Sequence, residues 1–125
     1  MITIQAIRIK NVFPITKNNH YWEFYIPVGS KIMLLSHQLF ELPLGYKMNI
    51  PENIVGKIYL NDKLYERGII QSNGIHILTS QSNNKEIILK LMNISGSSVN
   101  IENFEPIAHI MFEKTETDII LEIED

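Results

Sequence analysis

Apolar and polar residues alternate along most of this chain, which is the pattern of β-strands that bury one face. The N-terminal stretch MITIQAIRIK shows the alternation, and so do YWEFYI at 21–26 and VGKIYL at 55–60. About ten such short segments follow one another, separated by turns at the roughly 8–12-residue spacing typical of sandwiches and barrels. The sequence therefore predicts an all-β fold, and it predicts no helix.

Three longer segments refine this prediction. KIMLLSHQLFEL at 31–42 is interrupted by Ser36-His37-Gln38, so it predicts either two strands or one bent strand. GIIQSNGIHIL at 68–78 predicts two strands around Ser72-Asn73-Gly74, because Asn-Gly is a strong signal for a hairpin turn. The C-terminal TDIILEIED at 117–125 alternates again. It predicts either a strand in its own sheet or a strand added to a neighbouring subunit.

Composition narrows the class of protein. A chain of 125 residues has the size of one domain, and we expect residues 1–125 to form it. The 11 Lys and Arg residues are scattered and the net charge is −3, which argues against nucleic acid as a partner. Absence of cysteine excludes disulfides and thiolate metal sites and suits a reducing compartment. No apolar run approaches the roughly 20 residues that span a bilayer.

Several polar residues invite a chemical role that their spacing does not support. The four histidines lie far apart without a metal-binding spacing, so we expect no metal and no cofactor. Glu102 and Glu105 are interpreted as solvated carboxylates. Asn93-Ile94-Ser95 matches a glycosylation sequon, which we expect to be unused because the alternating N-terminus is unlike a secretory signal.

Tyr21, Trp22, Phe24 and Tyr25 form an aromatic cluster in the sequence. On a strand, Trp22 and Phe24 point to one face and Tyr21, Glu23 and Tyr25 to the other. One face can therefore pack in the core. Tyr21, Trp22 and Tyr25 are candidates for a protein-binding surface, because Trp and Tyr are frequent binding anchors.

Two segments in order carry a resemblance to a known family. They are LPLGYKMNIPENIVGKI, 42–58, and EIILKLMNISGSSVNIENFEPIAHIMFEK, 86–114. This order resembles the trimeric dUTPase family. Leu60-Asn61-Asp62 followed by Arg67-Gly68-Ile69 is similar to the dUTPase-derived early proteins of adenoviruses. The resemblance implies a β-clip or jelly-roll-like barrel, a homotrimer, and a viral protein that acts in the cytoplasm or nucleus of an infected host cell.

The same resemblance places the residues of a dUTPase site. That chemistry needs cations and hydroxyls on the triphosphate and a carboxylate that orients water. Glu23 stands near the acidic position of the first motif. Asn61 and Asp62 replace the Arg-Ser of the second motif, which binds phosphate. In the third motif Ser80, Ser82 and Asn83 replace two Asp and a Tyr. These six residues are candidate remnants of a nucleotide site.

The last two motifs are also altered. Phe104-Glu105-Pro106 replaces the Gly-Asp-Arg of the fourth motif, and the Gly-rich C-terminal arm of the fifth is absent. Turn formers and core residues are kept, while the polar residues that the reaction needs are lost. Tyr59 and Tyr65 flank the second motif and are expected to fill the former pocket.

These observations predict a catalytically inactive protein that binds host proteins. One alternative is a dUTP hydrolase that uses a relocated metal-binding set of Glu23, Asp62 and Glu105. A second is a structural component of the virion. The C-terminal Ile123-Glu124-Asp125 does not fit a PDZ domain, whose pocket takes a small apolar last residue.

Overall fold

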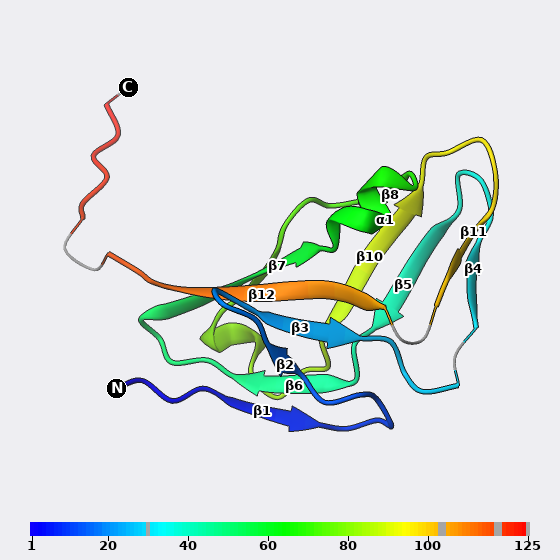
Figure 1. Cartoon of the computed structure of the whole chain (residues 1–125). Helices are drawn as coiled ribbons and strands as arrows, with labels where there is room; N and C mark the ends of the chain where they lie inside the picture. Colours follow the sequence, from blue (N-terminus) through cyan, green and yellow to red (C-terminus); the bar gives the residue numbers. More distant parts are fainter. Residues whose placement is uncertain (30, 103–104, 117–118, 125) are drawn as a thin grey trace.

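The structure is a computed structural model that describes residues 1–29, 31–102, 105–116 and 119–124. Strands dominate it, as the alternation predicts (Figure 1). In chain order they are β1 (Gln5–Arg8), β2 (Thr16–Lys17), β3 (Trp22–Tyr25), β4 (Ile32–Leu34), β5 (Leu39–Pro43), β6 (Tyr46–Asn49), β7 (Ile54–Leu60), β8 (Ile69–Gln71), β9 (His76–Leu78), β10 (Ile88–Asn93), β11 (Val99–Ile101) and β12 (Pro106–Lys114). A short helix, α1 (Asp62–Glu66), follows β7, and a 3-10 turn, η1 (Ser80–Ser82), follows β9.

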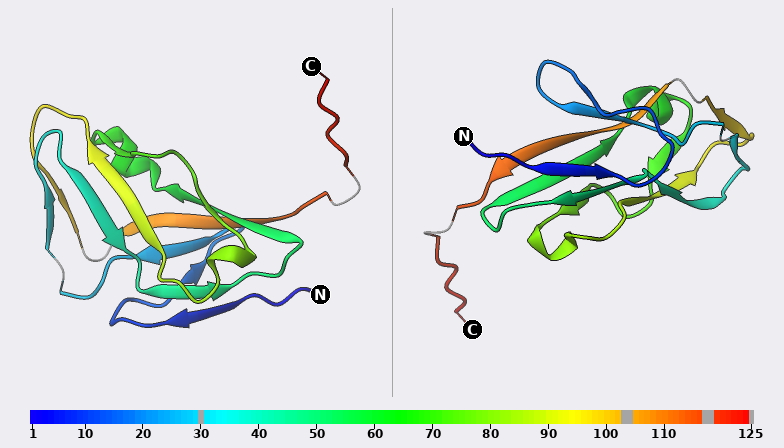
Figure 2. Two further views of the ribbon diagram at one scale, coloured as in Figure 1. Left: turned by 180° about the vertical axis from the view of Figure 1, so that it is seen from behind. Right: turned by 90° about the horizontal axis from the view of Figure 1, so that it is seen from below.

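Over the described residues, the strands form four antiparallel sheets around one core. The largest has the order β2-β3-β12-β7-β9, and a second has the order β5-β10-β8. The pairs β1-β6 and β4-β11 complete the set. Figure 1 shows β12 and β3 in front of β10 and β5, and Figure 2 shows the same two layers from behind. The predicted all-β class is confirmed.

The core fills the space between these layers. Phe24, Ile58 and Ile110 enter it from the large sheet, and Leu89 and Leu91 enter it from β10. Each is fully buried. Because side chains alternate along a strand, the neighbours of the first three point to the outer face of the large sheet. That outer face carries the candidate site described below.

The segment around Asn73-Gly74 departs from the prediction. Both strands exist, but β8 pairs with β10 and β9 pairs with β7, so they do not form a hairpin with each other. The turn is closed by Gly74 N–H donating to the carbonyl of Gln71 at 3.2 Å. A turn is present, but Gly74 has a positive φ and Asn73 does not, so it is not the Asn-Gly hairpin turn that was predicted. The predicted pairing was also wrong, because long-range partners decide it.

Helix α1 was not predicted, although its start carries a local signal. Asn61 has extended backbone angles, and its side-chain oxygen accepts a 2.9 Å hydrogen bond from the Lys63 N–H. Asp62 lies in the first turn, where a carboxylate favours the helix dipole. The interruption at 36–38 likewise resolves as two strands, β4 and β5, one of the two forms that the sequence allowed.

The C-terminal segment does not form a strand of its own sheet. Residues 119–124 carry no regular structure and lie apart from the sheets (Figure 1). Ile119, Ile120, Leu121 and Ile123 are 70 % or more exposed. Thr117, Asp118 and Asp125 lie outside the described residues. The prediction about a PDZ domain depends on Asp125 and is therefore not tested by the structure.

Asn93 is fully buried at the end of β10, and its side-chain nitrogen donates to the carbonyls of Leu34 and Ser97. A glycan cannot reach that nitrogen without unfolding this region. The expectation that the sequon is unused agrees with this burial.

Gly68 provides a test of backbone packing. It has φ +88°, and a Cβ there would lie 2.7 Å from the Cβ of Ser95. We expect Gly68→Ala to lower the free energy of unfolding by about 2–3 kcal/mol, from left-handed strain and the collision together. Gly74 has a similar φ of +76° with open space around it, so Gly74→Ala is the matched control and should cost only about 1 kcal/mol. Urea unfolding of both variants measures the difference, and equal losses would contradict the role given to Ser95.

Candidate functional site

Three outward-facing side chains form a row across the middle of the large sheet. In the registers of β3, β12 and β7, Glu23 lies opposite His109, and His109 lies opposite Tyr59. All three are partly exposed, while Phe24 and Ile110 beside them point into the core. The row is therefore fixed by the strand registers and by the buried residues beneath it.

His109 is stacked between two tyrosines. Its ring centroid lies 5.4 Å from that of Tyr59, with an interplanar angle of 15°. On the other side the Tyr21 ring lies 4.3 Å away at 34°. We call these three rings the Tyr-His-Tyr stack. Offset ring contacts of this kind each contribute about 0.5–1.5 kcal/mol, so the three side chains hold one another in place.

Two carboxylates flank the stack. Glu23 accepts a 2.8 Å hydrogen bond from the Asn18 side chain, and Asp62 lies in the exposed first turn of α1. Within the described ranges the ion pairs are Lys10–Glu86, Lys57–Glu113 and Arg67–Glu105, so neither Glu23 nor Asp62 has a cationic partner there. The carboxylates face the stack unneutralised.

Burial and charge act on His109 in opposite directions. Desolvation lowers the pKa of His109 below its usual value, and the weaker effects of Asp62 and then Glu23 raise it. The neutral imidazole is therefore the dominant form at pH 7.

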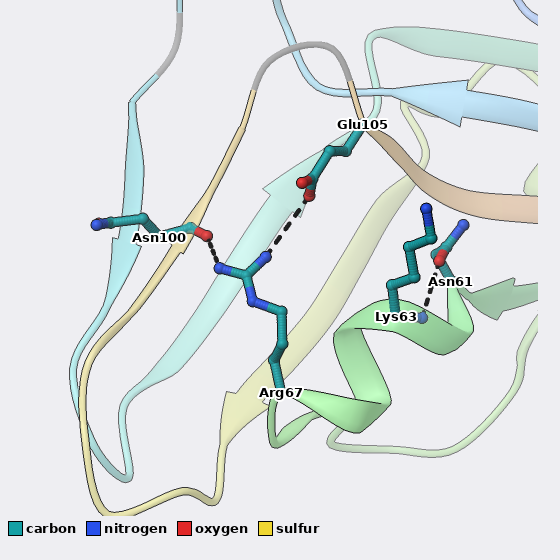
Figure 3. A network of polar contacts seen from close by, with 5 residues as sticks. All are labelled: Asn61, Lys63, Arg67, Asn100 and Glu105. Carbon is teal, nitrogen blue, oxygen red and sulfur yellow. Dashed lines mark hydrogen bonds and ion pairs between the residues drawn. The ribbon is translucent and has the colours of Figure 1, made fainter.

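Lys63 follows Asp62 in the chain, and Figure 3 shows its side chain alongside that of Asn61.

A pH titration by NMR checks this arrangement. We expect the pKa of His109 to lie below 6.5, and Glu23→Gln to lower it further because a favourable charge is removed. The unfolded chain then takes up the proton first. The stability that His109 contributes is accordingly present above pH 6.5 and is lost as the pH falls below it. A His109 pKa that rises in Glu23→Gln would show that Glu23 does not face the ring.

The other predicted remnants lie elsewhere in the subunit. Leu78, the last residue of β9, pairs with Gly56 of β7. Gly56 lies four residues before Leu60, where β7 ends, and η1 follows Leu78 in the direction away from that end. At about 3.3 Å per residue this places Ser80 and Ser82 more than ~13 Å from the start of α1. One chain therefore brings Glu23, Asn61 and Asp62 together and leaves Ser80, Ser82 and Asn83 at the opposite end of β7.

Those distant residues have structural partners. The Ser82 hydroxyl donates to the carbonyl of Thr79 at 2.7 Å and accepts from the Thr79 N–H at 2.9 Å. The Asn83 side chain accepts from the N–H of Ile50 at 2.6 Å and donates to its carbonyl at 3.1 Å. These groups hold the turn after β9 against the end of β6. Asn61 is similarly used as the N-cap of α1.

Gln71 is a site neighbour that the sequence did not point out. It is buried, and its amide donates to the carbonyl of Ile58 and accepts from the N–H of Leu60. Tyr65 donates to the same Gln71 oxygen at 3.1 Å, and burial raises the pKa of its phenol. Tyr65 lies on α1 at the second motif and is 42 % exposed, while Tyr59 lies in the stack on the outer face of β7. The sequence offers no clear signal for Gln71, because it directly follows Ile69-Ile70 and precedes the polar Ser72-Asn73.

Glu105 does not join Glu23 and Asp62. It pairs with Arg67 at 3.5 Å, and the same guanidinium donates to the carbonyl of Asn100 (Figure 3). No group of three His, Cys, Asp or Glu residues that could hold a metal occurs in the part of the chain that the structure describes. The relocated metal-binding set is therefore not assembled within one subunit. Phe104, its neighbour in the fourth motif, lies outside the described residues.

The three aromatic residues proposed as a binding surface do not share one face. Tyr21 belongs to the stack. The Trp22 ring lies with its centroid 5.6 Å from that of Phe112 on the opposite face of the sheet, where it lines an apolar cleft with residues of the N-terminal segment 2–6. Tyr25 shares a hydrogen bond of 3.1 Å with Thr16. The alternation along β3 explains the division.

The fold is that of the dUTPases. No protein-family model matches the chain, and no curated protein matches it. Among solved structures, a mutant dUTPase of Staphylococcus bacteriophage 80alpha has a TM-score of 0.83 at 13 % identity, covering 100 % of this chain and 98 % of that one. A mutant dUTPase from phage phi11 of S. aureus has a TM-score of 0.81 at 10 % identity, with coverages of 99 % and 98 %. EIAV dUTPase has a TM-score of 0.77 at 14 % identity and 98 % coverage of both chains.

These similarities confirm the dUTPase-like fold over the full length of the chain. At such identities they do not extend to the side chains of the site. Among the described residues, no helix is long and apolar enough to cross a membrane.

Proposed function

We propose that this chain is a dUTPase-fold protein that does not hydrolyse dUTP and acts by binding other proteins. As the adenoviral resemblance implies, we place that action in the cytoplasm or nucleus of an infected host cell. The proposal is supported by the side chains at the positions of the dUTPase motifs. The fold itself is equally compatible with an enzyme.

The observation that carries the proposal is Asp62 at the second motif, whereas Glu23 beside the stack keeps the acidic character of the first motif. The family holds phosphate with Arg and Ser at the positions of Asn61 and Asp62. An acidic side chain repels the triphosphate there, by ~4 kcal/mol for one like-charge contact at about 4 Å and an effective dielectric constant near 20. No cation pairs with either carboxylate within the described ranges.

The third motif adds a second argument. Ser80 and Ser82 stand where the family has carboxylates, and a serine hydroxyl is not a general base near neutral pH. Ser82 and Asn83 are also committed to hydrogen bonds within their own turn. They are therefore not available to orient a water for attack on phosphorus.

A direct assay tests the proposal. The purified chain is incubated with dUTP and Mg²⁺, and pyrophosphate release is followed beside phage 80alpha dUTPase as the positive control. We expect no release above buffer. Calorimetry with dUpNHpp should likewise give no binding heat, because the site lacks its phosphate cations. Sustained release of pyrophosphate would overturn the proposal.

The second candidate is a dUTP hydrolase, and the comparisons favour it by one observation. A mutant of the phage 80alpha dUTPase in complex with dUpNHpp has a TM-score of 0.83, covering 100 % of this chain. A backbone able to surround the nucleotide is thus retained in outline. If the parent chain releases pyrophosphate, loss of this activity in both Glu23→Gln and Asp62→Asn would assign Mg²⁺ binding to these carboxylates. Wild-type rates in both variants would exclude that assignment.

We also propose that the chain assembles as a homotrimer, as the resemblance implies. The support is the exposed segment 119–124, whose four large aliphatic side chains need cover. Its alternation suits a strand added to a neighbouring subunit. Light scattering should give a mass about three times 14.5 kDa, and a mass near 14.5 kDa itself would refute the trimer.

A further inference from the structure

The Tyr-His-Tyr stack and its two carboxylates, which have no ion-pair partner among the described residues, lie on the outer side of the large sheet. The stack offers ring faces and edges on this side of the sheet, and the His109 ring makes no hydrogen bond with the described residues. Glu23 and Asp62 both act on the ring from nearby, and both are acidic. On β7, Lys57 is held by Glu113 at 3.0 Å, and the side chain of Lys63 lies alongside that of Asn61 at the start of α1 (Figure 3).

We propose that this surface binds the guanidinium of an arginine side chain presented by a partner protein. The inference rests on the proposed function, since it names the chemistry of the partner that the protein-binding role requires. The arginine plane stacks against Tyr21 or Tyr59, and its N–H groups pair with Glu23 and Asp62.

Charge and ring geometry together select this ligand. Tyrosine faces attract cations, and the attraction grows when the cation is partly desolvated, as it would be between two side chains. Two unpaired carboxylates add attraction for a cation and repel any phosphate or acidic peptide. Among the described residues, no group of three His, Cys, Asp or Glu side chains that could hold a metal is found at this surface.

Arginine fits better than lysine for a geometric reason. Its guanidinium is planar, so it can lie against a ring and still direct N–H groups sideways to carboxylates. A lysine ammonium is a compact and strongly hydrated charge that cannot do both. Arginine is also one of the three residues that most often anchor protein interfaces, with Trp and Tyr.

The site is already organised for this ligand. Asn18 holds Glu23 by a 2.8 Å hydrogen bond and its amide lies 3.4 Å from the Tyr21 hydroxyl. His109 holds both tyrosine rings in place. Little side-chain entropy is then lost on binding, which favours affinity from a small contact.

The test uses an acetylated and amidated Gly-Arg-Arg-Gly peptide titrated into the full chain and followed by NMR. We expect saturable shifts of the His109 ring signals and of the Tyr21 and Tyr59 rings, weakened by added salt. The same peptide with citrulline, which keeps the shape and removes the charge, should not bind. Shifts that map to another surface, or equal binding of the citrulline peptide, would overturn the proposal.

Variants separate the site from general charge. The double variant Glu23→Gln, Asp62→Asn should bind the arginine peptide about tenfold more weakly. The control double variant Glu41→Gln, Glu52→Gln removes the same charge from exposed positions outside the stack and should bind within about twofold of the parent chain. Equal weakening in both would show attraction by net charge alone. Circular dichroism checks that each variant is folded, and the shift map of the unmodified chain decides the result if one is not.

Two further ligands test whether the surface prefers arginine over other organic cations. Gly-Lys-Lys-Gly and spermidine should each bind more weakly than the arginine peptide. Equal or tighter binding of either would replace arginine recognition by general cation binding. The dUTP assay is independent of these titrations, so the two proposals can fail separately. Hydrolysis of dUTP would contradict the proposed function, and absence of arginine binding would contradict the present inference.

Discussion

Replacing Asn93 with alanine is expected to lower the free energy of unfolding by about 4 kcal/mol. The side chain is fully buried, and its nitrogen donates to Leu34 at 3.0 Å and to Ser97 at 2.9 Å. Its oxygen accepts from the N–H and the hydroxyl of Ser95 at 2.9 and 2.7 Å. Alanine would leave these groups without their partner, and each buried group left unsatisfied costs about 1–3 kcal/mol.

Urea unfolding measures this loss, which is large against the total of about 5–15 kcal/mol typical of a domain. Asn100→Ala is the matched control, because Asn100 is an exposed residue of β11 and no hydrogen bond of its side chain joins it to the described residues. It should cost no more than about 0.5 kcal/mol. Similar losses in the two variants would mean that the β10 end does not depend on the Asn93 side chain.

The second large effect is expected for Phe24→Ala, at about 3–5 kcal/mol. Phe24 is fully buried beneath the site, and its ring packs edge-on against Tyr46 with centroids 6.0 Å apart. Removing it leaves a cavity directly behind Glu23, where surrounding strands cannot collapse without breaking their registers. Thermal or urea unfolding gives the magnitude.

Phe24→Leu distinguishes packing from any direct role in the site. It keeps most of the volume and should cost less than about 1.5 kcal/mol. In this variant the pKa of His109 should still lie below 6.5, because Glu23 and the outer face of β3 are unchanged. A His109 pKa that returned to the usual value would show that the stack depends on the ring beneath it.

The alternation of the sequence was sufficient for the strands and insufficient for their partners. Period-two patterning located β3, β6, β7, β10 and β12 because each buries one face. It could not tell that β8 and β9 belong to different sheets, since pairing across a sheet is decided by residues far apart in the chain. The tail at 119–124 alternates without forming a strand, because alternation marks a strand only when a partner surface is present.

The site was partly predictable. Glu23, Asn61 and Asp62 were identified from the family resemblance, and the structure places them on the same side of the large sheet. For His109 the sequence predicted only that it has no metal role, and its position in the stack was not anticipated. Only the registers of β3, β12 and β7 bring it between Tyr21 and Tyr59.

The exposed aliphatic tail has a consequence for how this protein responds to heat. Any association that removes side chains such as Ile120 and Leu121 from water is stabilised by the burial of their apolar surface. If assembly stabilises the folded chain in this way, folding is coupled to assembly, and the stability depends on the protein concentration by mass action. The melting temperature should climb as the protein is concentrated, and calorimetry of dissociation should reveal a positive heat-capacity change from the hydration of those residues.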